Sequence, residues 1–80
     1  MNFEGINFPV YRKYKNDKSY FKIMNPRQFE EIQLIGKKKV IRHTEAKQFP
    51  ELLFIHDLVF NFSEMADEVS QQQYETIRDK

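Results

Sequence analysis

The sequence contains no cysteine and no tryptophan, and only two glycines and three prolines among 80 residues. Without cysteine the chain can form no disulfide, no thiolate zinc site and no thiol nucleophile. Small secreted domains usually depend on disulfides, so this absence favours a reduced, cytoplasmic setting. Gly5 and Gly36 stand alone in the sequence, which excludes a Gly-rich phosphate-binding loop.

Long hydrophobic runs are also missing. The longest apolar stretch, residues 52–62, is interrupted by His56, Asp57 and Asn61 and is too short to cross a membrane. The first nine residues lack the basic region followed by an apolar stretch that marks a signal peptide. We therefore expect no membrane association.

The composition that remains is that of a globular chain. Hydrophobic residues make up 40% and aromatic residues 15%, so we expect a single α+β domain over residues 1–80. A core of this size does not need eight phenylalanines and four tyrosines. Several rings are therefore expected either on the surface or in a self-association interface.

The formal net charge of +1 hides an asymmetry between the two halves of the chain. Residues 1–48 carry a net charge of +6, whereas residues 49–80 carry −5. Strands from distant parts of a small sheet are usually neighbours, so we expect the two halves to interleave in space and their charges to cancel. The alternative is a bipolar molecule.

Residues 10–24 predict a β-hairpin. The basic residues of 10–15 suit a half-exposed edge strand, because lysine and arginine discourage edge-to-edge pairing. In the second strand, residues 19–24, alternation predicts that Phe21 and Ile23 point inward and that Tyr20 points outward.

A second hairpin is predicted further along the chain. Gly36 and Lys37 match the loop of a type II′ turn, which joins a strand at 31–35 to one at 38–46. The later strand is the most polar, so we expect it at an edge. Residues 25–30 precede this hairpin, and we expect a turn of helix, capped by Asn25, or irregular structure there. A continuous strand is the alternative.

The apolar stretch at 52–62 has mostly apolar side chains on both faces at a period of two, which favours a buried strand. A helix over 52–60 is the competing interpretation, because Pro50 suits a first helical turn and leucine favours helix. The acidic residues 63–68 are interpreted as a loop.

The C-terminal residues 70–79 predict a helix. Ser70 and Gln73 have the spacing of a capping box, and Tyr74 and Ile77 form a narrow apolar stripe. The expected fold is therefore α+β, a small and mainly antiparallel sheet of four or five strands with the C-terminal helix packed on one face.

Catalysis finds little support in the sequence. No serine lies in a Gly-flanked nucleophile elbow. On a strand, His56 and Asp57 point to opposite faces and cannot pair with each other. His43 and Glu45 share a strand face, but with only two histidines in the chain this pair is a weak indication of a metal site. We expect no enzymatic activity, no cofactor and no metal.

Cations and aromatic rings alternate in the first hairpin, and a second basic cluster follows it. Basic side chains neutralise phosphates, and exposed rings stack on unpaired bases. This pattern is typical of single-stranded nucleic-acid binding, although the near-neutral total charge argues against it. The candidate residues are Tyr11, Arg12, Lys13, Tyr14, Lys15, Tyr20, Lys22, Lys37, Lys38, Lys39 and Arg42.

Protein association is the leading hypothesis. Exposed aromatic residues, strand edges and an acidic C-terminal region suit homodimerisation or docking on another protein. A chain this small, without catalytic residues, is expected to act by binding. The sequence thus predicts a small, cytoplasmic, non-enzymatic binding module that associates with an unidentified protein partner or with itself, and nucleic-acid binding is the alternative.

Overall fold

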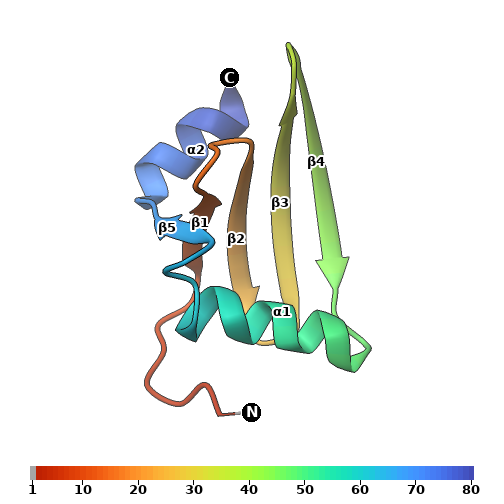
Figure 1. Cartoon of the computed structure of the whole chain (residues 1–80), viewed down its shortest axis with the longest axis vertical. Coiled ribbons are helices and arrows are strands. Elements are labelled where there is room, and N and C mark those ends of the chain that lie inside the picture. The colour runs from red at the N-terminus through yellow and green to blue at the C-terminus, as the bar shows by residue number, and fades with distance from the viewer. Residues whose placement is uncertain (1) are drawn as a thin grey trace.

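A five-stranded antiparallel sheet with the strand order β4-β3-β2-β1-β5 forms the centre of the computed structural model, which describes residues 2–80 (Figure 1). The first four strands follow one another along the chain, and β5 joins the far edge beside β1. The expected α+β class is confirmed, as is the C-terminal helix. The elements are β1 (Val10–Tyr14), β2 (Ser19–Asn25), β3 (Gln28–Ile35), β4 (Lys38–Glu45), α1 (Phe49–Phe60), β5 (Ala66–Glu68) and α2 (Gln71–Asp79).

Both predicted hairpins are present, but two of their details were wrong. β1 is not an edge strand, because it lies between β2 and β5. β3 begins at Gln28, so residues 28–30 are strand rather than helix or irregular structure. The reason lies at Asn25, whose side chain accepts a hydrogen bond from the Arg27 N–H at 2.8 Å and donates one to Gln28 at 2.9 Å. These bonds hold a tight turn between β2 and β3 instead of capping a helix.

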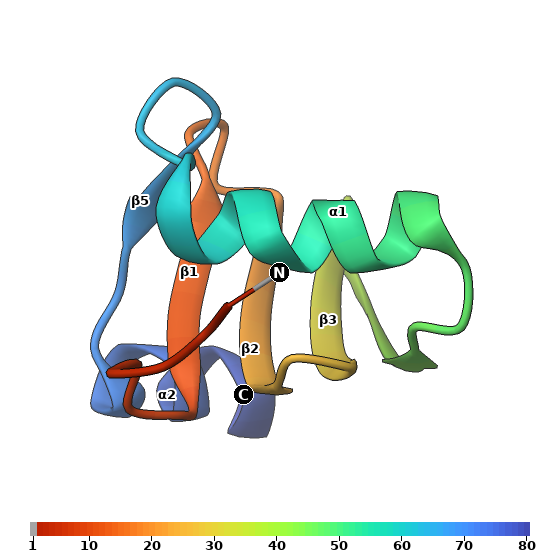
Figure 2. The same cartoon turned by 90° about the horizontal axis from the view of Figure 1, so that it is seen from below.

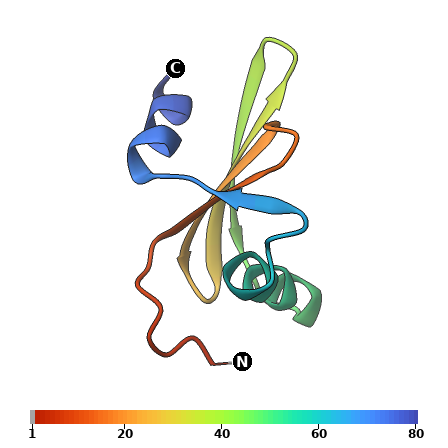
Figure 3. The same ribbon diagram turned by 60° about the vertical axis from the view of Figure 1, so that its left-hand side comes forward.

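The second hairpin has the predicted turn. Gly36 adopts a φ of +60°, whereas Lys37 has no positive φ, as a type II′ loop requires. β4 is an edge strand, as its polarity predicted. The turn end of this hairpin points away from α1 (Figure 3).

The strand favoured at residues 52–62 was wrong, and the competing helix over 52–60 is what forms, as part of α1 and followed by coil. Pro50 lies in the first turn, where its missing N–H costs nothing. The Glu51 carboxylate accepts hydrogen bonds from the N–H groups of Lys47 and Gln48, both at 3.2 Å, which fixes the start of the helix. α1 has a second apolar side in addition to its core face. When its sequence is read with the period of a strand, apolar residues therefore fall on both faces.

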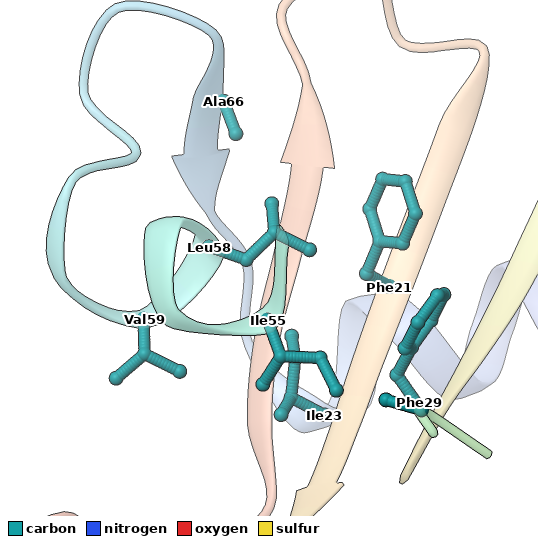
Figure 4. Packing of buried hydrophobic residues seen from close by; sticks show 8 residues of the cluster. Phe21, Ile23, Phe29, Ile55, Leu58, Val59 and Ala66 are labelled. Atoms are coloured by element: carbon teal, nitrogen blue, oxygen red, sulfur yellow. The ribbon is translucent and has the colours of Figure 1, made fainter. Parts of the chain in front are cut away.

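The larger core lies between α1 and one face of the sheet. Ile55 and Leu58 lie between the helix and the strands and are fully buried (Figure 4). The sheet contributes Phe21 and Ile23, which point inward as alternation predicted. The buried members of this cluster are Phe21, Ile23, Phe29, Ala46, Ile55, Leu58, Val59 and Ala66.

The opposite face of the sheet carries a smaller core beneath α2 (Figure 2). Tyr74 is 1% exposed and packs on Tyr11, Tyr20 and Ile32. Tyr20 points away from α1, as expected, but it is buried by α2 rather than exposed to solvent. The predicted C-terminal helix is confirmed, and the Ser70 side chain accepts the Gln73 N–H at 3.0 Å.

β5 occupies part of the stretch interpreted as a loop. It pairs with β1 and places Asp67 beside two basic residues of the first hairpin. Lys15 contacts the Asp67 carboxylate at 2.8 Å and Lys13 contacts it at 3.5 Å. The basic and acidic halves of the chain therefore interleave here, as expected. Neither helix within residues 2–80 is long and apolar enough to cross a membrane.

Replacing Leu58 with aspartate is expected to unfold the protein. Leu58 is fully buried, and an unpaired carboxylate there costs several kcal/mol, against a total stability of roughly 5 kcal/mol for a chain of this size. Leu53 lies on the same helix with 39% of its surface exposed, so Leu53→Asp is the matched control. Its free energy of unfolding should lie within about 1 kcal/mol of the parent's value. Thermal unfolding followed by circular dichroism measures both. A cooperative, unshifted melt of Leu58→Asp contradicts the core described above.

Candidate binding surfaces

The tyrosines of the first hairpin are packed against other parts of the protein. Tyr11 and Tyr20 are 9% and 6% exposed. The ring centroids of Tyr11 and of Tyr74 in α2 are 5.2 Å apart. Tyr14 lies on the other face of the sheet, where its ring and that of Phe21 are in edge-to-face contact with centroids 4.9 Å apart. The rings proposed for stacking on bases thus contribute to the two cores.

Arg12 contacts the end of α1 rather than presenting a free charge. Its Nε donates to the carbonyl oxygen of Leu58 at 2.9 Å, and its guanidinium lies 3.9 Å above the ring of Phe62. The last turn of α1 has no basic residue of its own, so Arg12 supplies the positive charge that favours a helix C-terminus. Burial lowers the pKa of Arg12, and the nearby Glu68 carboxylate opposes this effect.

Three of the predicted lysines are also engaged. Lys13 bonds to Asp17 as well as to Asp67, and its pKa is raised mainly by the hydrogen bond with Asp17. The hydrogen bond from Lys15 is the main cause of a lowered pKa at Asp67. Lys39 donates to carbonyl oxygens at the end of α2, including those of Ile77 at 3.4 Å and Lys80 at 2.8 Å.

The four remaining predicted cations make no ion pair and no side-chain hydrogen bond with any of the described residues; they are Lys22, Lys37, Lys38 and Arg42. Lys37, Lys38 and Arg42 are exposed on the β3–β4 hairpin. A hollow of about 320 Å³ lies between this hairpin and the end of α2. Its lining is Leu34, Gly36, Lys37, Lys38, Lys39, Ile77 and Lys80.

A stripe of three exposed apolar side chains and one half-buried histidine runs along one side of α1. We call this stripe, formed by Phe49, Leu53, His56 and Phe60, the α1 flank. The spacings of four, three and four residues place these side chains on one face of a helix. Phe49 is 64% exposed, Leu53 39% and Phe60 42%. Sequence reasoning missed this surface because it interpreted the same residues as a strand.

The N-terminal segment covers one end of the α1 flank. The ring centroid of Phe3 lies 5.5 Å from that of Phe60 and 6.0 Å from that of His56. Phe49, at the other end of the flank, lines a pocket of about 450 Å³. Among residues 2–80 its lining is Phe3, Glu4, Pro26, Arg27, Phe49 and Leu52. The pocket therefore lies between the N-terminal segment, the β2–β3 turn and the first turns of α1.

The histidines lie apart. His56 lies in α1, and its Nδ1 atom is buried without a hydrogen-bond partner among residues 2–80. Because residues 52–60 are helical, the Asp57 carboxylate approaches this atom to 3.7 Å, which a strand would not have allowed. His43 lies on β4 opposite Glu30, on the sheet face that α2 covers. No group of three or more potential metal-ligating side chains occurs within residues 2–80.

Comparison with protein-family models, curated proteins and solved structures finds no match to this chain. The functional argument therefore depends on the geometry of the surfaces described above.

A pH-dependent contact holds α2 over the tyrosines. The Glu30 carboxylate accepts hydrogen bonds at 2.9 Å from both the Tyr74 hydroxyl and the Arg78 Nε. Burial alone raises the pKa of Glu30, but the hydrogen bonds from Arg78 and Tyr74 outweigh it, and the net shift is downward. Burial, followed by the hydrogen bond to Glu30, raises the pKa of Tyr74.

Glu30→Gln is expected to make the free energy of unfolding less dependent on pH under acidic conditions. A carboxyl group with a lowered pKa in the folded state stabilises the protein above its unfolded pKa, and this contribution is lost as the pH falls through the folded value. The parent should therefore lose more stability than Glu30→Gln between about pH 5 and pH 3. Urea unfolding across this range measures the difference. Glu64→Gln, in an exposed turn, is the control and should follow the parent; equal profiles for all three proteins contradict the role of Glu30.

Proposed function

We propose that the chain is a protein-binding module and that its partner docks on the α1 flank. One observation carries the proposal: three of the five large, exposed hydrophobic side chains within residues 2–80 lie on this stripe of one helix. Isolated exposed hydrophobic residues are ordinary, but a contiguous apolar patch marks an interaction site. The composition without cysteine supports a cytoplasmic setting for this binding.

The partner that fits this surface is an amphipathic helix of another protein. The spacing of Phe49, Leu53, His56 and Phe60 alternates between four and three, which is the spacing of a helix–helix seam. The adjoining pocket of about 450 Å³ can hold one large apolar side chain of the partner as an anchor. Glu4 and Arg27 at this pocket carry opposite charges and can pair with polar residues that border the partner's apolar face.

The test is an amide NMR titration of the full chain with a synthetic amphipathic helix of leucine, alanine and lysine in heptad spacing. Chemical-shift changes are expected at residues 49–60 and at the β2–β3 turn. Leu53→Asp should remove them while leaving the melt intact, because a charge on the flank opposes an apolar partner without entering the core. Ile41→Asp, on the edge strand β4, is the matched control and should bind as the parent does. Binding that survives Leu53→Asp rejects the α1 flank.

Single-stranded nucleic-acid binding is the second candidate. The observation in its favour is the group of exposed, unpaired cations Lys37, Lys38 and Arg42 on the β3–β4 hairpin, near the hollow of about 320 Å³. Such cations bind phosphates and release counterions, so binding must weaken as salt rises. The aromatic contribution that the sequence suggested is weak here, because Tyr11 and Tyr20 are buried.

Fluorescence anisotropy with a mixed-sequence single-stranded oligonucleotide distinguishes the two functions. A nucleic-acid binder loses about tenfold or more in affinity when Lys37 and Lys38 are both replaced by glutamate, because each reversal turns an attraction to phosphate into a repulsion. Lys18→Glu, an exposed charge in the β1–β2 turn, is the control. If the chain is a protein-binding module, the parent should show no salt-dependent binding to the oligonucleotide. Tight binding of the oligonucleotide that is lost on charge reversal at Lys38 would overturn the first proposal.

A further inference from the structure

The N-terminal segment, residues 2–8, contains a tight turn and lies at the same end of the molecule as α1 (Figure 1). The Ile6 N–H donates to the Phe3 carbonyl oxygen at 3.1 Å, and Gly5 has a φ of +86°. Both features are expected of a type II turn, in which the third residue needs a positive φ. The turn folds the segment back and brings Phe3 onto the α1 flank.

Apolar side chains hold this segment in place. Within residues 2–80, no hydrogen bond joins residues 2–8 to any other part of the chain. Phe3, Ile6 and Phe8 are instead half-buried against the larger core. A segment with few hydrogen bonds to its surroundings opens at a lower free energy than the core strands and helices. Phe3 can therefore leave α1 without breaking a hydrogen bond of the sheet.

Phe3 occupies part of the surface proposed for docking. Its ring is tilted against the ring of Phe60 and meets the ring of His56 edge to face. Phe60 keeps 42% of its surface exposed, so the cover is partial. Phe3 also lines the pocket beside Phe49. One side chain of the chain itself thus borders both the α1 flank and the pocket assigned to the partner's anchor.

We propose that residues 2–8 are an internal competitor for the α1 flank and that a partner helix binds by displacing Phe3. The inference rests on the proposed docking function and adds how that site is regulated. An apolar side chain of the partner takes the place of the Phe3 ring on Phe60 and His56. Because only the open form binds, the apparent dissociation constant is the intrinsic value divided by the open fraction.

The competitor also makes the surface selective. A partner helix that presents a large apolar side chain at this point replaces the contacts of Phe3 with Phe60 and His56. A partner with a small side chain there displaces Phe3 without recovering those contacts and binds more weakly.

Two substitutions weaken the competitor in different ways. Gly5→Ala disturbs the turn without changing the flank: there is room for a Cβ, but alanine rarely adopts a φ of +86°. Phe3→Ser removes the competing ring itself. Gly36→Ala is the matched control, because Gly36 also has room for a Cβ and a positive φ, of +60°, but lies in the β3–β4 turn.

Isothermal titration calorimetry measures the affinity of each full chain for the synthetic helix of leucine, alanine and lysine. Gly5→Ala and Phe3→Ser should each bind about fivefold more tightly than the parent, because each raises the open fraction. Gly36→Ala should bind as the parent does. If the parent binds but Gly5→Ala binds no more tightly, or Phe3→Ser binds more weakly, the competitor is rejected and the docking function stands.

NMR spectra of the free proteins test the competitor without a partner. Gly5→Ala should move the resonances of His56 and Phe60, because the Phe3 ring moves away from them, and Gly36→Ala should leave them in place. Unmoved resonances in Gly5→Ala overturn the inference. Binding of the synthetic helix by Phe3→Ser but not by the parent supports both proposals. If none of these proteins binds it, the proposed function is rejected, and the competitor with it.

Discussion

The rest of the structure depends on strand β2, whose side chains need cover on both faces of the sheet. Phe21 and Ile23 pack beneath α1, and Tyr20 packs beneath α2. A chain of 80 residues buries only about 60% of the surface that its unfolded form exposes, so two separate small cores leave little apolar surface to spare. Each helix is therefore required for the sheet, and, within residues 2–80, three of the five large apolar residues that neither core absorbs lie on the α1 flank.

Basic residues of the sheet secure both helices in the same way. Arg12 bonds to the last turn of α1, and Lys39 bonds to carbonyl oxygens at the end of α2. A positive charge at these ends complements the helix dipole. β5 adds Asp67 next to Lys13 and Lys15, so two of the cations in the first hairpin are neutralised locally. Part of the basic half of the sequence thus stabilises the fold, while Lys37, Lys38 and Arg42 on the β3–β4 hairpin stay exposed without a side-chain partner among residues 2–80.

The sequence predicted the elements whose signals are local. Alternation and turn residues indicated the hairpins, and the Ser70 cap with Tyr74 indicated α2. At α1 a strand was favoured over the competing helix, which is the one that forms, because the second apolar side of α1 removed the amphipathic pattern and a period of two fitted as well as 3.6. β5 was missed because its three residues become a strand only by pairing with β1. The burial of Tyr20 and the α1 flank depend on how α2 and α1 pack, and no pattern within a single segment encodes that packing.

The order of the strands also affects how the chain acquires its structure during synthesis. The pairings among β1 to β4 join strands that are neighbours in sequence, whereas β5 pairs with β1 across a long stretch of chain, with Lys13 opposite Asp67. Local pairings form early because they close short loops, and distant ones form late. On the ribosome, the four-stranded meander and α1 emerge before β5 and α2. The Tyr11 and Tyr20 rings then stay open to solvent until the last residues of α2 leave the exit tunnel, and in this interval a nascent chain is most exposed to chaperones or to aggregation.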